Sequence, residues 1–204
     1  MKINHVDSDF PLIIIDDYYS EEEISLIWQE LNFILKPTAW HLGSDCESGS
    51  ALDEFGVPLK SNYSLFLDHV FSDRNFSNIL KVNRKLFNYW DDIISENNSW
   101  FFKNFNCIAD FTMLSYYEDK DYYDFHRDDA CITSLTWIYK TPRKFSGGDL
   151  YFEDERMIDV MNNRTVIFPS MMKHKVSCIS MNTDDVNKKL GRFCITQFLH
   201  ANNF

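Results

Sequence analysis

Glycine and proline are scarce in this sequence, with 6 and 5 copies among 204 residues. No segment is of low complexity, and no period repeats along the chain, so neither a flexible linker nor a repeat array is predicted. Near the N-terminus the apolar run "PLIII" is too short for a signal-peptide core or a membrane span. We therefore expect a single domain over residues 1–204 that does not associate with a membrane.

Positive charge and paired cysteines are also in short supply. Lys plus Arg number 20 against 31 for Asp plus Glu, which gives a formal net charge of -11. An acidic surface repels phosphate backbones, so we expect no nucleic-acid partner. The cysteines are odd in number and form no C-x-x-C pair, which argues against a disulfide framework and for a reducing, cytoplasmic location. They are Cys46, Cys107, Cys131, Cys178 and Cys194. The sequence carries no signal for oligomeric state.

Hydrophobic residues make up 45% of the chain and aromatic residues 16%, enough for a sizeable core. Helical signals dominate the first hundred residues. Ser20 and Glu23 have capping-box spacing, and the apolar stripe that follows predicts a helix after the short strand "PLIIID". A second stripe predicts one helix over 77–94, whereas 41–63 has the composition of a loop.

Strand signals dominate the second hundred residues. Seven short segments rich in β-branched and aromatic residues follow one another, separated in several places by turn residues. They are "IADFTMLSYY", "YYDFH", "CITSLTWIYK", "DLYFE", "RTVIFPS", "HKVSCIS" and "RFCITQFLH". This pattern predicts an α+β fold, mainly β: a sandwich or barrel-like roll with the helices forming a layer on one face.

The segment "FHRDD" contains the first two candidate metal ligands. His126 and Asp128 are two positions apart, and on a strand that spacing places both side chains on one face. An imidazole beside a carboxylate offers two ligands to a divalent metal. The pair alone is a weak signal, because H-x-D is common in polar turns.

Three more residues, His174, Arg192 and Thr196, complete a more specific pattern. His174 follows 48 positions after His126 and opens a predicted strand. Two histidines and one carboxylate form the facial triad of non-heme Fe(II) sites, which leaves coordination positions open on one side. Arg192 begins the last predicted strand, with Thr196 on the same face. Since a buried guanidinium needs an anionic partner, this pair predicts a carboxylate-binding site.

The segments "YEDKDYYDFHRD", "FSGGDLYF", "RTVIFPSMMKHKV" and "GRFCITQF" resemble the prolyl 4-hydroxylase-like branch of the 2-oxoglutarate- and Fe(II)-dependent dioxygenases. The resemblance covers residues 110–200. Family members often carry tyrosines at the positions of Tyr117 and Tyr123. Asp119 and Lys120 depart from the pattern, because many relatives have Pro-Gly there.

The resemblance implies a double-stranded β-helix, or jelly roll, with its core over residues 105–200. It implies that His126, Asp128 and His174 hold Fe(II), that Arg192 pairs with the distal carboxylate of the co-substrate 2-oxoglutarate, and that Thr196 and Tyr117 help to bind it. The implied reaction is hydroxylation of a C–H bond with succinate and CO2 as co-products, with ascorbate as an optional reductant. Trp137 and Tyr139 are expected to pack in the core, with contact to the co-substrate as the alternative.

The sequence does not identify the substrate. The resemblance favours a prolyl, peptidyl or amino-acid substrate, and the short chain also permits another small metabolite. A non-catalytic metal-binding jelly roll and an oxygen-independent zinc hydrolase are the other two classes that the ligand pattern allows.

Overall fold

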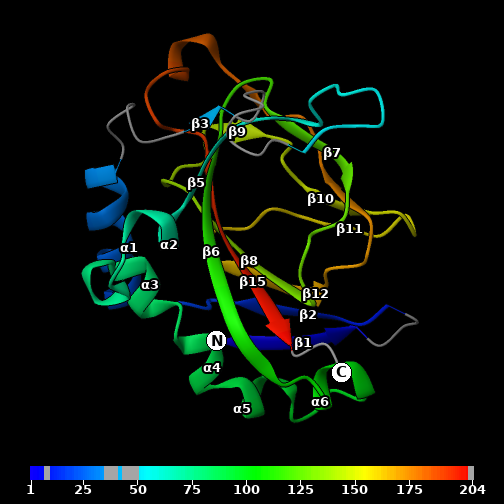
Figure 1. Ribbon diagram of the computed structural model, residues 1–204. Coiled ribbons are helices and arrows are strands. Elements are labelled where there is room, and N and C mark those ends of the chain that lie inside the picture. Colours follow the sequence, from blue (N-terminus) through cyan, green and yellow to red (C-terminus); the bar gives the residue numbers. More distant parts are fainter. Residues whose placement is uncertain (7–9, 35–40, 43–50, 202–204) are drawn as a thin grey trace.

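The computed structural model describes residues 1–6, 10–34, 41–42 and 51–201, and shows two facing antiparallel β-sheets with helices on the outside of the larger one (Figure 1). The larger sheet has eight strands in the order β1 (Lys2–Val6), β2 (Leu12–Asp16), β12 (Arg164–Pro169), β8 (Ile132–Ile138), β15 (Arg192–Ala201), β6 (Cys107–Tyr117), β5 (Tyr63–Phe66) and β3 (His41–Leu42). The smaller sheet has five, in the order β11 (Met157–Ile158), β10 (Leu150–Phe152), β13 (His174–Val176), β7 (Tyr122–His126) and β4 (Lys60–Ser61).

A two-stranded ribbon, β14 (Ser180–Met181) with β9 (Phe145–Ser146), completes the β structure. The helices are α1 (Glu21–Ile34), α2 (Leu67–Val70), α3 (Asn78–Val82), α4 (Lys85–Asn88), α5 (Trp90–Ile94) and α6 (Trp100–Lys103). This arrangement confirms the predicted mainly β fold, a jelly roll with N-terminal helices packed on one sheet.

The central strands of the larger sheet are buried on both faces because their side chains alternate between two cores. On β15, Phe193 and Ile195 pack against the helices, while Cys194 faces the smaller sheet. On β8, Ile132 and Ile138 face the helices and Leu135 faces the smaller sheet in the same way. Every residue of β8 is buried. The interior between the two sheets therefore receives alternate side chains of β6, β8 and β15.

Two predictions for the first hundred residues need correction. The helix predicted over 77–94 is three short helices, α3, α4 and α5. The helix is interrupted first at the fully buried Asn83, whose side chain forms hydrogen bonds with those of Tyr19 and Thr112. It is interrupted again at Tyr89, whose backbone is not helical. Likewise the loop predicted over 41–63 contains β3 and β4 and the first residue of β5. Residues 43–50, including Cys46, lie outside the described part.

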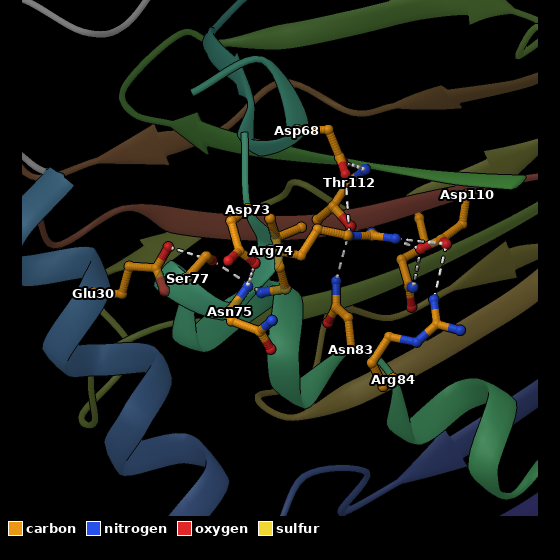
Figure 2. Close-up of polar contacts among 12 residues, drawn as sticks. Glu30, Asp68, Asp73, Arg74, Asn75, Ser77, Asn83, Arg84, Asp110 and Thr112 are labelled. Atoms are coloured by element: carbon orange, nitrogen blue, oxygen red, sulfur yellow. Dashed lines mark hydrogen bonds and ion pairs between the residues drawn. The ribbon is translucent and has the colours of Figure 1, made fainter. Parts of the chain in front are cut away.

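The capping box predicted at the start of α1 is confirmed. The Glu23 backbone N–H donates to Ser20 Oγ at 3.2 Å, and the Ser20 N–H donates to Glu23 Oε2 at 2.8 Å. At the other end of the same helix lies Glu30, which is 7% exposed. It accepts hydrogen bonds from Ser77 Oγ at 2.7 Å and from the Ile79 N–H at 2.8 Å, as part of the polar network in Figure 2. Glu30 thus ties α1 to the start of α3.

Replacing Glu30 by alanine should lower the free energy of unfolding by about 2–4 kcal/mol, because it leaves a buried hydroxyl and a buried N–H unpaired. Glu30→Gln keeps an acceptor and should cost roughly half as much. Gln29→Ala, on the exposed face of the same helix, serves as the control and should change stability by about 0.5 kcal/mol or less. Urea unfolding of the three variants measures the differences, and equal losses at positions 29 and 30 would contradict this role.

A second part of the same network fastens the helical segment to β6. Arg74 donates through two nitrogens to the carboxylate of Asp110, each at 2.8 Å, and Arg84 donates to it at 2.9 Å (Figure 2). Asp68 accepts the backbone N–H of Thr112 at 2.6 Å. These bonds hold the segment before the jelly roll against a central strand of the larger sheet.

Asp121, in the connection between β6 and β7, is a buried acid without a cationic partner in the described residues. It accepts hydrogen bonds from Ser61 Oγ at 2.9 Å and from the Glu118 N–H at 2.8 Å. Burial raises the pKa of Asp121 to about 6, against 3.8 for an unperturbed aspartate, even though these hydrogen bonds oppose the shift.

The neighbouring Lys120 has a φ of 70°. This is the left-handed conformation that suits the glycine of the Pro-Gly pair that many relatives carry at positions 119 and 120.

The raised pKa makes stability depend on pH in an uncommon direction. Between pH 6 and pH 4 the folded state binds more protons at Asp121 than the unfolded state, so this group stabilises the fold as pH falls through that range. Relative to Asp121→Asn, the wild type should gain about 2 kcal/mol between pH 7 and pH 4.5. Urea unfolding of both proteins across this range measures it, and a constant difference between them would contradict the shift.

Among the described residues, no helix combines the length and the apolar character that crossing a membrane requires. The four cysteines that the structure describes, Cys107, Cys131, Cys178 and Cys194, are free thiols, in agreement with the prediction that they form no disulfide framework.

Candidate metal centre

Three side chains, two from the smaller sheet and one from the turn that follows β7, meet between the two sheets. His126 is the last residue of β7, and His174 is the first residue of the adjacent strand β13, where the two are directly paired in register. Asp128 lies two residues beyond the end of β7, so its position depends on the turn and not on strand alternation. Its backbone N–H donates to Ser170 O at 3.2 Å, which holds that turn against the end of β12.

The donor atoms of this triad lie close enough to share one metal ion. Asp128 Oδ1 lies 3.5 Å from His126 Nε2, and Asp128 Oδ2 lies 3.5 Å from His174 Nε2. All three ligand atoms fall within 4.8 Å of one another. His126 and His174 are 8% and 3% exposed, so each imidazole is fixed by its surroundings.

Backbone contacts determine which nitrogen of each histidine faces the centre. Nδ1 of His126 lies 2.8 Å from Asp124 O, and Nδ1 of His174 lies 2.8 Å from Met172 O. A carbonyl oxygen can only accept, so each Nδ1 carries the proton and each Nε2 presents its lone pair to the centre. The ring of Tyr123 stacks on His126 at 3.4 Å and 4°, which fixes the plane of that imidazole.

The electrostatics suit metal binding at neutral pH. Burial lowers the pKa of His174 to about 4, so its imidazole is neutral and available as a ligand. Burial alone would raise the pKa of Asp128, but its interactions with His126, His174 and Thr133 outweigh that effect, so the pKa lies below its usual value and the carboxylate is ionised.

A second layer of hydroxyl groups, which the sequence reading did not identify, orients Asp128. Thr133 Oγ1 donates to Asp128 Oδ2 at 2.6 Å and lies 2.8 Å from Ser170 Oγ. Both hydroxyls are fully buried. The alternation of β8 is the signal that could have found Thr133, because it shares a face with Leu135 and Trp137.

The triad opens into a pocket between the sheets that we call the inner pocket. Arg192 from β15 and Tyr117 from β6, which are paired across those strands, form its far wall. The full lining is Met113, Ser115, Tyr117, Tyr123, His126, Asp128, Thr133, Leu135, Trp137, Leu150, His174, Val176, Arg192, Cys194, Thr196 and Phe198. All six predicted site residues are therefore brought to one cavity.

Arg192 is the most unusual member of this lining. It is 1% exposed, and within the described part of the chain its Nε and Nη2 have no hydrogen-bond acceptor. Its guanidinium lies 4.4 Å from the ring centre of Tyr117 and 6.0 Å from that of Trp137. Among the described residues this buried cation has aromatic rings beside it and no anion to compensate its desolvation. The inner pocket thus contains a buried positive charge with two nitrogens free of acceptors within the described part of the chain.

Two glycines of the segment "FSGGDLYF" shape the pocket beside this guanidinium. Gly147 and Gly148 both have positive φ, at 72° and 76°. A Cβ at Gly148 would lie 3.1 Å from the Ile179 side chain and 3.4 Å from Arg192 Nε, so the absent side chain leaves room beside the guanidinium. Among the remaining candidates, Thr196 lines the inner pocket, whereas Tyr139 packs edge-on against Phe145 and does not.

The fold of the chain is that of prolyl hydroxylases and 2-oxoglutarate-Fe(II) oxygenases. A prolyl hydroxylase from Trichoplax adhaerens, solved with a hypoxia inducible factor peptide fragment, is 15% identical, with a TM-score of 0.61 over 93% of this chain and 83% of that one. A prolyl-4-hydroxylase from Pseudomonas putida is 11% identical, with a TM-score of 0.62 over 93% and 92%.

The viral collagen prolyl hydroxylase from Paramecium Bursaria Chlorella virus-1, in its 2OG complex, is 12% identical, with a TM-score of 0.57 over 94% of this chain and 96% of that one. No protein-family profile and no curated protein sequence matches this chain. The likeness therefore lies in the fold, and conclusions about chemistry depend on the residues of the site.

Proposed function

We propose that this protein is a 2-oxoglutarate- and Fe(II)-dependent dioxygenase that hydroxylates a C–H bond of a prolyl, peptidyl or amino-acid substrate. The single observation that carries the proposal is the buried guanidinium of Arg192, unpaired among the described residues, in the same pocket as the His126, Asp128 and His174 donors. A metal site alone fits many activities. A metal site that shares its pocket with an unpaired buried cation fits a dicarboxylate co-substrate.

The residues fit Fe(II) and 2-oxoglutarate in type as well as in place. His126, Asp128 and His174 supply two neutral imidazoles and one carboxylate, the facial donor set that leaves positions open for other ligands. Arg192 would pair with the distal carboxylate of 2-oxoglutarate through its planar fork. Thr196 lies on the same face of β15 and would add a hydroxyl contact, and the ring of Tyr117 supports the guanidinium.

When both are bound, Fe(II) and 2-oxoglutarate supply the oxidising chemistry, in which one oxygen atom of O2 enters the substrate and the other enters succinate as CO2 is lost. The contribution of the chain is binding, orientation and exclusion of water. Thr133 and the carbonyl groups of Asp124 and Met172 hold the donors in place, and the apolar walls from Leu135, Trp137 and Leu150 keep the cavity dry.

A turnover assay tests the proposal. Purified protein with Fe(II), 2-oxoglutarate and ascorbate should release succinate only in the presence of oxygen, and a candidate substrate should gain about 16 Da, one oxygen atom. Prolyl peptides and amino acids are the first substrates to try, because prolyl hydroxylases share the fold. Activity that survives under nitrogen would instead indicate a hydrolase, and metal binding without any turnover would indicate a non-catalytic jelly roll.

A further inference from the structure

A second cavity, which we call the outer pocket, adjoins the inner one on the side of Asp128. Met113, Tyr123, Asp128 and Phe198 line both cavities, so the two share a wall. The outer pocket has a volume of about 460 Å³ and is lined by Ala51, Lys60, Phe66, His69, Phe111, Met113, Tyr123, Arg127, Asp128, Asp129, Phe198 and His200. A molecule in it would lie next to the metal donors.

Lys60 is the notable residue of this lining. It comes from β4, in the segment that had been predicted to be a loop, and it is only 7% exposed. Its backbone is paired with Tyr123, and the Asp124 N–H donates to Leu59 O at 2.7 Å, which fixes β4 against β7. The position of Lys60 is therefore set by the sheet.

The ammonium group of Lys60 lacks a close anion. Its Nζ lies 5.4 Å from the ring centre of Tyr123, the same ring that stacks on His126. Among the described residues, no carboxylate lies within ion-pairing distance of it. Burial lowers the pKa of Lys60, and the charge of Asp128 opposes that shift. Lysine is seldom buried without a partner, and the described part of the chain supplies none for this ammonium, so a bound anion can take that place.

The other cation of the outer pocket is already engaged. Arg127 Nε donates to Met171 O at 2.9 Å, and its guanidinium lies 3.9 Å from Glu153. Two acids, Asp128 and Asp129, line the same cavity. One available cation beside two acids suits a single negative charge, as on a carboxylate, better than the double charge of a phosphate.

The rest of the lining is aromatic. The rings of Phe66 and Phe198 lie 6.2 Å apart, and His69 and His200 pack against Phe66 and Phe111 at 5.3 Å and 5.6 Å. Such a wall holds a compact apolar ring well, because flat faces offer large contact area.

We propose that Lys60 selects the substrate by pairing with a carboxylate on it, while the aromatic wall holds an apolar ring next to that carboxylate. As a statement about substrate the inference depends on the proposed oxygenase function. It narrows that function to small acids or the C-terminal end of a peptide, with the substrate carboxylate in the outer pocket and the co-substrate beside Arg192 in the inner pocket.

Binding to the metal-free protein tests the inference separately from catalysis. The probes are N-acetyl-L-proline and N-acetyl-L-phenylalanine, each compared with its primary amide by isothermal titration calorimetry or ligand-observed NMR. The wild type should bind at least one acid about tenfold more tightly than the matching amide, as a charge-assisted hydrogen bond requires. Lys60→Met should remove this preference, and Lys60→Arg should keep most of it.

Arg192→Met is the control for acid binding at the co-substrate position, and the preference should survive in it. Equal binding of acid and amide, a preference that persists in Lys60→Met, or no detectable binding of either acid would overturn the inference. Loss of the preference in Arg192→Met would also overturn it, because the acids would then occupy the inner pocket. The binding assay contains no iron, so its result does not depend on catalysis. If the turnover assay fails but the acid preference still depends on Lys60, the oxygenase function is rejected and the binding site remains.

Discussion

Arg192→Met should make the ligand-free protein more stable while it abolishes the response to 2-oxoglutarate. The wild type holds a guanidinium that is 1% exposed and has no acceptor for Nε or Nη2 among the described residues. Removing an uncompensated buried charge relieves its desolvation cost, and the contact with the Tyr117 ring offsets only part of that cost. We expect a net gain of about 1–3 kcal/mol in the free energy of unfolding without ligand.

The same substitution should remove co-substrate binding. At a concentration of 2-oxoglutarate about 100 times its Kd, the wild type should gain about 2.7 kcal/mol from ligand binding, and the variant should gain almost nothing. Succinate formation at low 2-oxoglutarate should fall by about 100-fold or more, because a bidentate charged pair is lost. Urea unfolding with and without 2-oxoglutarate, in the presence of a redox-inert divalent metal, measures both effects.

Arg192→Lys is the informative control for this prediction. Lysine keeps the positive charge but not the planar fork, so it should retain part of the ligand stabilisation and should not gain the stability of the methionine variant. If Arg192→Met unfolds at lower urea than the wild type, the guanidinium is compensated in solution. If it still responds to 2-oxoglutarate, the carboxylate partner is a different residue.

The strand core and the candidate donors could be predicted because their signals are local. Each strand of the second half is a short run of β-branched and aromatic residues, and the alternation that buries them also fixes which neighbours face the cavity. Arg192 and Thr196 are found in this way, since they lie four positions apart on β15 and therefore on the same face. Asp128 also lies beside His126, but a turn and not strand alternation positions it, because β7 ends at His126.

The parts that could not be predicted depend on contacts between distant segments. Lys60 lies in a stretch with the composition of a loop, and it becomes part of β4 only because β7 offers an edge to pair with. The helix predicted over 77–94 is interrupted at Asn83, whose side chain forms hydrogen bonds with Tyr19 and Thr112. No local sequence pattern reveals these two contacts. Tertiary hydrogen bonds outweigh local propensity at both places.

Asp128→Ala should lower the affinity for Fe(II) by at least about 100-fold and reduce succinate formation below detection. The variant loses the one anionic donor of the triad, and the two neutral imidazoles that remain offer no charge to a divalent ion. Anaerobic equilibrium dialysis of Fe(II) measures the affinity, and the turnover assay measures the second effect. His126→Ala and His174→Ala should behave in the same way, since each removes one of the three donors.

Two neighbouring substitutions separate ligation from general damage to this corner of the molecule. Thr133→Val removes the hydroxyl that donates to Asp128 Oδ2 at 2.6 Å, so the affinity for Fe(II) should fall by about 10–100-fold without being lost. Asp129→Ala removes an exposed acid one residue from Asp128 and should leave the affinity unchanged. The expected order is therefore Asp129→Ala, Thr133→Val and then Asp128→Ala. Equal losses at 128 and 129 would mean that the acids act only through general charge, because direct coordination involves the Asp128 carboxylate alone.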